Sequence, residues 1–434
     1  MQSPSTNRRT FLFKSATAAA AVAAGSQVDI MDNAYAGGGD SLKVGLVGCG
    51  GRGTGAAEQA LTADKGNYLY AMADAFASQI EQGYSALKGS EVPGVAERVD
   101  VPPERRYVGF DAYKQVIDEC DVVLLTTSPA FRPIHFAYAV AKGKHAFVEK
   151  PMAVDGPGLR MFLDAARASK AKGLSAVNGF CWRYYKPRRE LMARVFGGEI
   201  GPITSIETTY NSQGVWEPRK TREQCSSEME YQLRNWYYYS WLSGDHIVEQ
   251  AVHGIDTMAW AMGDVPPTRC WGVGGRQART EPKYGNIYDH FSIVYEYPDD
   301  IRGYHHCRHW ANTPAQTADY IQGTKGRADV FGRRITGTNK WRYRGEPGEK
   351  IDMYQVEHNE MFAALRAGAP INNAEQAATS TQLALMGRMA AYTGEVITWD
   401  QARESQDALV PPTLSWDVAP PMRPVPIPGV TKFS

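Results

Sequence analysis

The stretch Leu42-Lys-Val-Gly-Leu-Val-Gly-Cys-Gly-Gly-Arg-Gly53 decides the fold of this 434-residue chain. Its first half, residues 42–47, is a short apolar run that predicts a buried β-strand. Its second half, Gly48-x-Gly50-x-x-Gly53, predicts a tight turn, and a helix-permissive stretch continues from it through Leu61. The sequence therefore predicts a strand, a glycine turn and a helix in immediate succession.

An acidic residue follows this unit at an informative distance. A second apolar run, Tyr68 to Met72, ends at Asp74, about twenty residues after the turn. Gly48 permits the tight turn, Gly50 lets the backbone approach a diphosphate, and Gly53 lets the helix pack on the strand. The helix N-terminus offers free N–H groups to phosphates. Asp74 would bind the adenosine ribose hydroxyls, which favours NAD over NADP, while FAD stays possible.

Composition and charge argue against several classes of partner. The chain carries 47 basic and 47 acidic residues, so neither a nucleic acid nor a membrane surface would find a net attractive field. Apolar residues make up 43% of the chain, which is a globular composition. No C-x-x-C pair occurs, which favours scattered reduced thiols over structural zinc. The six cysteines stand at positions 49, 120, 181, 225, 270 and 307.

The first 36 residues resemble an export signal rather than part of a fold. Arg8-Arg9 precede Phe-Leu, a mildly apolar alanine-rich run follows, and Ala34-Tyr35-Ala36 supplies a small-x-small cleavage site. These features predict a Tat-type signal over residues 1–36 and a periplasmic or otherwise exported protein beginning near Gly37. A Sec signal or a frayed tail is the alternative. No later stretch is long and apolar enough to predict membrane insertion.

The rest of the chain predicts an α/β fold with two domains. Strands alternate with helices from residue 42 to residue 178, which predicts a parallel sheet and a Rossmann dinucleotide-binding domain over residues 37–178. Strands then recur at hairpin-like intervals, which predicts an α+β domain over residues 179–400 with a large open, mainly antiparallel sheet. Residues 401–434 are proline-rich and predict an extended tail. The second domain is expected to contain strands at 203–210, 268–277, 289–297 and 301–310, and helices at 246–262, 352–367 and 374–392.

Two further motifs complete a resemblance to a known family. Glu149-Lys150-Pro151 stands at the C-terminal end of an expected strand, where open α/β sheets place ligands. Glu249-x-x-x-His253-x-x-Asp256 lies on an expected helix. Together with the glycine turn and Asp74, these motifs resemble the Gfo/Idh/MocA oxidoreductase family over residues 42 to about 400. Its members are mostly NAD(P)-dependent sugar, inositol and glycoside dehydrogenases or reductases. A few exported members hold the dinucleotide permanently, and one branch uses it to hydrolyse glycosidic bonds.

The resemblance implies three catalytic residues. Lys150 matches the family's lysine near the reacting hydroxyl, His253 matches its catalytic histidine, and Glu249 stands where the family usually has aspartate. The residues themselves agree, since positions 249 and 253 fall on one face of a helix that Asp245 would cap. His253 would take the hydroxyl proton, and Lys150 would stabilise the developing negative charge. A satisfied core histidine and an ordinary exposed lysine are the alternatives.

Motif position and the resemblance together imply the ligand-binding residues. The expected cofactor site comprises Gly48, Cys49, Gly50, Gly51, Arg52, Gly53, Asp74, Thr126, Thr127, Ser128, Pro129, His135, Glu149 and Lys150. The expected substrate site comprises Arg183, Tyr184, Trp236, Tyr238 and His253. Arg183 and Tyr184 open the second domain and would equally serve to pack the domains together. Only one or two aromatic residues of the cluster at 231–241 are expected to touch a sugar.

A metal site is the weaker interpretation of Tyr304-His-His-Cys-Arg-His309. On a strand, His305, Cys307 and His309 would share one face, which is a known ligand geometry. The family needs no metal, and its second sheet commonly packs against another subunit. Packing or an interface is therefore favoured, and no metal is expected. The chain is expected to form a homodimer or homotetramer through this sheet.

These observations together predict an NAD-dependent sugar or glycoside oxidoreductase. Because the space beyond the cytoplasm generally lacks free NAD, an exported enzyme must hold its cofactor tightly and regenerate it in place. An NAD-assisted glycoside hydrolase, which oxidises, eliminates, adds water and re-reduces, is the close alternative. A non-catalytic dinucleotide-binding protein is a distant third, because it would not require both Lys150 and His253.

Overall fold

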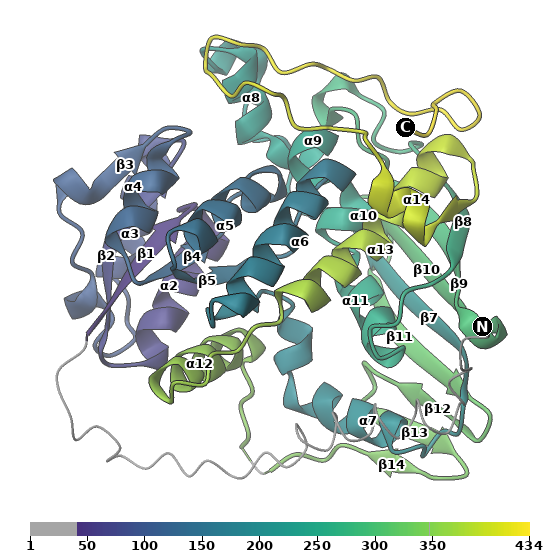
Figure 1. Cartoon of the computed structure of the whole chain (residues 1–434). Coiled ribbons are helices and arrows are strands. Elements are labelled where there is room, and N and C mark those ends of the chain that lie inside the picture. The colour runs from purple at the N-terminus through teal and green to yellow at the C-terminus, as the bar shows by residue number, and fades with distance from the viewer. Residues whose placement is uncertain (1–40, 347) are drawn as a thin grey trace, which may run out of the picture.

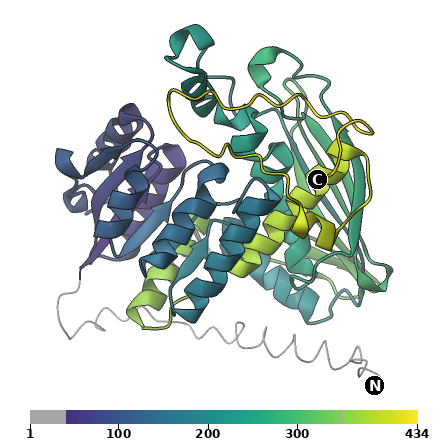
Figure 2. The same cartoon turned by 45° about the horizontal axis from the view of Figure 1, so that its top comes forward.

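Two β-sheets organise the chain in the computed structural model, which describes residues 41–346 and 348–434 (Figure 1). The predicted signal over residues 1–36 lies outside the described residues. The first sheet has six strands and the second has nine. Helices cover both faces of the first sheet, and a helical layer lies between the two sheets (Figures 1 and 2).

The first sheet is the predicted Rossmann-like parallel sheet, with strand order β3-β2-β1-β4-β5-β6. Helices bury both faces of this sheet, and its strands are therefore rich in apolar residues. The order reverses between β1 and β4, which opens a crevice at the carboxyl ends of these strands. The strands are β1 Leu42–Val47, β2 Asn67–Asp74, β3 Arg106–Val108, β4 Val122–Leu125, β5 His145–Val148 and β6 Ala176–Asn178. The helices are α2 Gly51–Ala63, α3 Ala77–Lys88, α4 Ala112–Glu119, α5 Arg132–Ala141 and α6 Gly156–Ala171.

The second sheet has the order β14-β13-β12-β11-β7-β10-β9-β8-β15. Its pairs are antiparallel except for β7 and β10, so the prediction of a mainly antiparallel sheet is confirmed. The four predicted strands are β7 Ile203–Ser212, β8 Arg269–Gly275, β9 His290–Glu296 and β10 Arg302–His309. The others are β11 Gln316–Gly323, β12 Gly326–Asp329, β13 Arg334–Gly337, β14 Trp341–Arg342 and β15 Ile397–Thr398. These were missed because most of them are short and rich in polar residues.

The helix predicted over residues 246–262 is wrong as a single element. It is two segments, α10 His246–Glu249 and α11 Val252–Ala261. The Ala251 N–H donates to the His246 carbonyl oxygen, five residues back, so an extra residue separates the two helical turns. Asp245 caps only the first segment, where its carboxylate accepts from the His246 N–H. The remaining helices are α7 Lys186–Phe196, α8 Glu228–Arg234, α9 Ser240–Ser243, α12 Met353–Arg366, α13 Ala374–Thr393 and α14 Trp399–Glu404.

The chain after residue 350 returns to the first sheet. Helix α12 packs along α2, where Arg366 forms an ion pair with Asp64 at 2.6 Å. Helix α13 lies between α6 and the second sheet, and the Thr381 hydroxyl accepts from the Met152 N–H at 3.1 Å (Figure 1). These contacts tie the second half of the chain to the Rossmann domain at several points.

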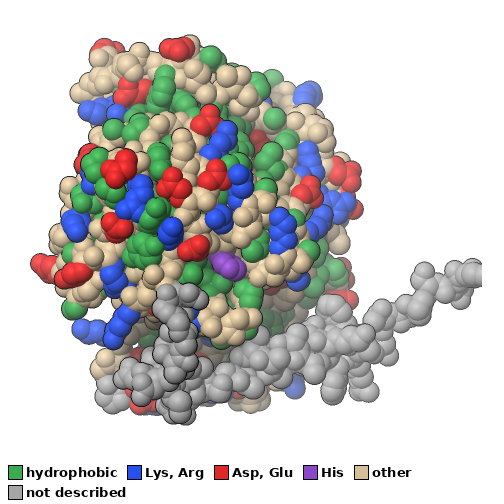
Figure 3. Space-filling model, turned by 60° about the vertical axis from the view of Figure 1, so that its left-hand side comes forward, with side chains coloured by type: hydrophobic (Ala, Val, Ile, Leu, Met, Phe, Trp, Pro, Cys, Tyr) green, Lys and Arg blue, Asp and Glu red, His purple; other side chains and the backbone are tan. Residues whose placement is uncertain are grey.

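The proline-rich tail runs without helix or strand after Glu404, across α8 and α9 (Figures 1 and 2). It is held by hydrogen bonds to distant residues, including Leu409 N–H to the Asp155 carboxylate at 2.7 Å and Tyr288 hydroxyl to the Pro426 carbonyl at 2.9 Å. On the face shown in Figure 3, acidic and basic side chains are interspersed. Within the described ranges, no helix is long and apolar enough to cross a membrane.

Gly53→Ala is expected to destabilise the first domain, because a methyl group at residue 53 would stand 1.9 Å from the Gly48 carbonyl oxygen. Relieving this clash requires the turn or α2 to move, which costs about 1–3 kcal/mol. Urea unfolding followed by circular dichroism measures the loss. Gly51→Ala is the matched control, since no atom lies within 4 Å of a methyl group there. Equal unfolding midpoints for the two variants would contradict the expectation.

Candidate active site

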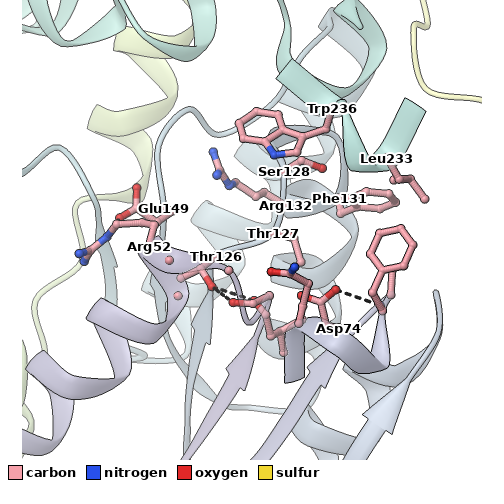
Figure 4. A pocket seen from close by; sticks show the side chains of 18 of the residues that line it. Arg52, Asp74, Thr126, Thr127, Ser128, Phe131, Arg132, Glu149, Leu233 and Trp236 are labelled. Carbon is pink, nitrogen blue, oxygen red and sulfur yellow. Dashed lines mark hydrogen bonds and ion pairs between the residues drawn. The ribbon is translucent and has the colours of Figure 1, made fainter. Parts of the chain in front are cut away.

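A cavity of about 900 Å³ lies where the carboxyl edge of the first sheet meets the second domain. At one end it is lined by the glycine turn and Asp74, and at the other by Lys150, Glu249 and His253. Figure 4 shows the arrangement, with Trp236 and Leu233 of the second domain facing the Rossmann edge across the open space. All of the expected cofactor residues line this cavity except Cys49 and Pro129.

The glycine turn leaves room for a diphosphate. Gly48 has a left-handed backbone with φ +98°, and a methyl group there would stand 2.6 Å from the Thr127 nitrogen. By contrast, the nearest atom to a methyl group at Gly50 is 3.9 Å away, and Gly51 faces open space. No side chain caps the N-terminus of α2, so its N–H groups remain available to an anion. These features fit the dinucleotide that the sequence predicts.

Asp74 closes the other side of this turn. Its carboxylate accepts from the backbone N–H groups of Cys49 at 2.8 Å and Phe76 at 3.0 Å, and burial raises its pKa. Cys49, an expected site residue, does not line the cavity, because its thiol turns into the core and donates to the Ala73 carbonyl. Pro129 does not line it either, since it is buried at the start of a 3-10 turn.

Three of the predicted residues converge at the opposite end. The Lys150 ammonium donates to the Glu249 carbonyl oxygen at 2.5 Å and lies 3.3 Å from the Glu249 carboxylate. His253 is buried against the same cavity, and burial together with Lys150 and Arg188 holds its pKa well below 6.5. The imidazole is therefore neutral at neutral pH. A neutral imidazole beside an ammonium group suits proton transfer from a hydroxyl.

An unpredicted aromatic stack supports the histidine. The Trp182 ring lies 4.8 Å from the His253 ring at an interplanar angle of 24°, and the Arg188 guanidinium stands 3.9 Å from the centroid of the Trp182 ring. Phe331 meets Trp182 edge-on at 5.3 Å. Trp182 directly precedes Arg183, which the sequence analysis did select. Nothing in the local sequence indicates which of these two side chains lies against His253.

The expectation that Arg183, Tyr184 and Tyr238 contact substrate is not supported, since none of the three lines the cavity. Arg183 forms a buried ion pair with Asp256 at 2.9 Å and a partly exposed one with Asp264 at 2.7 Å, so it joins elements of the second domain. The Tyr184 hydroxyl accepts from the Asn373 amide, and the Tyr238 hydroxyl donates to the Trp216 carbonyl. Trp236 and His253 do line the cavity.

Several cavity residues escaped the sequence analysis because they come from distant segments. Two residues of the expected site, Glu149 and Arg52, form an ion pair at 2.6 Å. Arg52 also lies 3.7 Å from the buried Glu357 of α12, which the sequence analysis did not select. The unpredicted lining residues with polar side chains include Gln79, Arg132, Arg219, Lys220, Arg234, Gln250 and Tyr354. These residues lie up to 275 positions apart in the sequence, so the sequence gives no indication that they meet.

The histidines of β10 are committed to hydrogen bonds. His305 shares a bond with the Thr208 hydroxyl at 2.8 Å, and His309 bonds to the Tyr288 carbonyl at 2.9 Å while stacking on His246. In the part of the chain that the structure describes, no group of three or more potential ligands is arranged to hold a metal ion.

Comparison with known proteins gives two family matches. Residues 42–177 match the model described as an oxidoreductase family with an NAD-binding Rossmann fold, and residues 189–329 match the GFO/IDH/MocA C-terminal domain. An inositol 2-dehydrogenase from Pseudomonas syringae pv. syringae is 30% identical over 123 residues. That match covers 28% of this chain and 35% of the relative, so the chain spans about a third of the relative's length.

Solved structures share the fold. A levoglucosan dehydrogenase in complex with NADH and levoglucosan has a TM-score of 0.65 at 16% identity, covering 83% of this chain and 99% of that one. An aldose–aldose oxidoreductase from Caulobacter crescentus has a TM-score of 0.63 at 16% identity, covering 83% and 100%.

Trp182→Ala is expected to raise the pKa of His253 toward 6.5, because removing the ring admits water to one face of an imidazole whose pKa burial depresses. Trp182→Phe, which keeps an aromatic face on the imidazole, is the control and should leave that pKa low. NMR titration of the histidine ring protons measures both. An unchanged pKa in a folded alanine variant would show that the stack does not govern the ionisation of His253.

Proposed function

Since the chain belongs to the Gfo/Idh/MocA oxidoreductase family, we propose that it transfers hydride between a secondary carbinol carbon of a sugar or glycoside and a tightly bound NAD. One observation carries the proposal. The glycine turn and Asp74 line the same cavity as Lys150, Glu249 and His253, so a dinucleotide site and a proton-transfer site are continuous. A protein that only bound a dinucleotide would not require the second set.

The chain's own residues would hold the cofactor in a defined way. The uncapped N-terminus of α2 would bind the diphosphate, and Asp74 would bind the adenosine ribose hydroxyls. A phosphate on that ribose would meet the Asp74 carboxylate, which supports NAD over NADP. When bound, NAD supplies the hydride acceptor. The side chains of Leu233 and Trp236, which face the Rossmann edge, support slow release of the cofactor (Figure 4).

Lys150, Glu249 and His253 would handle the hydroxyl proton. As the carbinol carbon is oxidised, the neutral His253 imidazole takes the proton from its oxygen. Lys150 donates a hydrogen bond to the same oxygen and stabilises the developing negative charge. Glu249 positions the Lys150 ammonium through both its carbonyl and its carboxylate. Reduction of a ketone reverses these proton movements.

An NAD-assisted glycoside hydrolase is the second candidate, and it is compatible with the export that the Arg8-Arg9 segment predicts. An exported enzyme with a retained cofactor must return the hydride on the enzyme. Transient oxidation of a glycoside hydroxyl acidifies the neighbouring C–H bond, elimination releases the aglycone, and water adds to the resulting double bond. Returning the hydride completes net hydrolysis with no change in the cofactor. Alternating oxidation of one sugar and reduction of another also restores it.

The proposal is tested with purified full-length protein and no added NAD. Denaturation is expected to release NAD(H) rather than NADP(H), and free sugars are expected to produce the absorbance of bound reduced nicotinamide. Repeated release of nitrophenol from p-nitrophenyl glycosides would instead establish net hydrolysis. A preparation that contains no dinucleotide and binds none would rule out both.

His253→Ala is expected to slow turnover by about 10²- to 10⁴-fold while leaving the cofactor bound. His145→Ala, a histidine outside the cavity, is the matched control. Because the pKa of His253 is depressed, its neutral form persists as the pH falls through 6.5, so the acid limb of the oxidation rate is expected below pH 6.5. Full activity in the His253 variant would remove this residue from the mechanism.

We also propose that the outer face of the second sheet forms a homodimer or homotetramer. Trp271, Tyr304 and Tyr320 stand half-buried in one cross-strand row on that face, with Val294 and Glu207 between them. Such a row of aromatic side chains is typical of an interface. Analytical ultracentrifugation is expected to show an oligomer that Tyr304→Glu dissociates, whereas a wild-type monomer at micromolar concentration would contradict the proposal.

A further inference from the structure

Arg132 is a buried cation that faces the cavity. It begins α5 and is only 4% exposed, yet it belongs to the cavity lining, and Figure 4 shows its side chain among those that point into the open space. Its Nη1 group donates to the carbonyl oxygen of Pro151 at 2.7 Å. Pro151 directly follows Lys150 in the chain, so this bond holds the guanidinium beside the Lys150 segment. The side chain is therefore held in place at the reacting end of the cavity.

The Glu149 and Glu249 carboxylates lie near enough to favour the charge of this guanidinium, but they form ion pairs with Arg52 and Lys150. Among the described residues Arg132 forms no ion pair of its own, and its buried Nε has no acceptor. Burial lowers the pKa of Arg132 to about 10, so the group stays charged at neutral pH. A buried charge without a partner is unfavourable in the free protein, and its presence indicates that a ligand completes the site.

Three other cations that line the cavity differ from Arg132, because each forms an ion pair with a carboxylate. Each of them has its own carboxylate: Arg52 with Glu149 at 2.6 Å, Lys150 with Glu249 at 3.3 Å, and Arg234 with Glu230 at 2.7 Å. These pairs are internally neutral, so they leave little net attraction for an anionic ligand. The positive charge that remains at the reacting end comes from Arg132.

Two more cations face the same cavity without forming an ion pair with any described residue, namely Arg219 and Lys220. Their backbone N–H groups both donate to the side-chain Oδ1 of Asn235, at 2.7 and 3.3 Å, and the Asn235 Nδ2 group donates back to the Lys220 backbone carbonyl at 2.9 Å. The Arg219 guanidinium rests 4.2 Å from the Trp216 ring. The loop is thus fixed in a position that adds positive potential to the cavity.

We propose that the substrate is an acidic sugar whose anionic group, a carboxylate or its sulfate or phosphate equivalent, binds to Arg132, with Arg219 and Lys220 reinforcing the field. The inference rests on the proposed oxidoreductase function and specifies its substrate. The diphosphate of the cofactor is the other possible anion, but its expected place is the α2 N-terminus at Gly50 and Gly51. Arg132 is tethered instead to the residue after Lys150.

The test compares uronates with the matching neutral sugars on the holoenzyme. Glucuronate and galacturonate are set against glucose and galactose, and the second-order rate constant for reduction of the bound cofactor is measured in single-turnover experiments. The wild type is expected to prefer the uronate by about tenfold or more, which corresponds to one charge-assisted hydrogen bond in a buried site. Arg132→Gln is expected to abolish that preference, and Arg132→Lys to keep part of it because the charge remains.

Arg234→Gln is the matched control, since it removes an arginine from the other end of the same cavity and should leave the uronate-to-aldose ratio unchanged. Oxidation of neutral sugars with no preference for uronates would overturn the inference while leaving the proposed function intact. Loss of retained NAD in Arg132→Gln without a change in the ratio would also overturn it, by assigning the anion to the cofactor. If neither class of sugar reduces the bound cofactor, the proposed function itself fails.

Discussion

The contact between Lys150 and Glu249 is the interaction on which the arrangement of this protein depends. Lys150 follows β5 at the carboxyl edge of the Rossmann sheet, and Glu249 ends α10 in the second domain. The ammonium donates to both the carbonyl and the carboxylate of Glu249, so one side chain joins the two domains at the reacting end of the cavity. Because both groups are largely buried, the pair is screened little by water, and it fixes the position of the charge beside His253.

The domains are joined at other points as well, so the two sides of the cavity are held together by more than one contact. Helices α12 and α13 pack on α2 and α6, and Arg366 pairs with Asp64 across the junction. Arg52 of α2 contacts Glu149 of the first domain and approaches Glu357 of α12. A dinucleotide held between elements tied together in this way would leave slowly, which agrees with a cofactor that is regenerated in place.

The electrostatics of the cavity differ from those of the whole chain. Overall charge is balanced, with 47 basic and 47 acidic residues. Within the cavity, burial keeps His253 neutral, and Glu149 and Glu249 form ion pairs with Arg52 and Lys150. Arg132 shares the field of these two carboxylates but forms no ion pair of its own with a described residue, and it keeps its charge. In the function proposed above, proton transfer and anion recognition would fall to different groups of the same cavity, and net charge alone reveals neither.

The sequence alone determined the Rossmann unit, because its signals are local: the turn at Gly48, Gly50 and Gly53 and the acid at Asp74 lie within about thirty residues and need only a strand and a helix to bring them together. Through motifs that resemble a family it also predicted Lys150 and His253 as catalytic residues, and both line the cavity. Only the tertiary structure decided that α10 and α11 are separate and that Trp182 rather than Arg183 stacks on His253. It also decided that Asp256 and Asp264 engage Arg183, and that Arg132 forms no ion pair of its own within the described chain. Each of these depends on which distant side chains packing brings into contact, and local spacing carries no information about that choice.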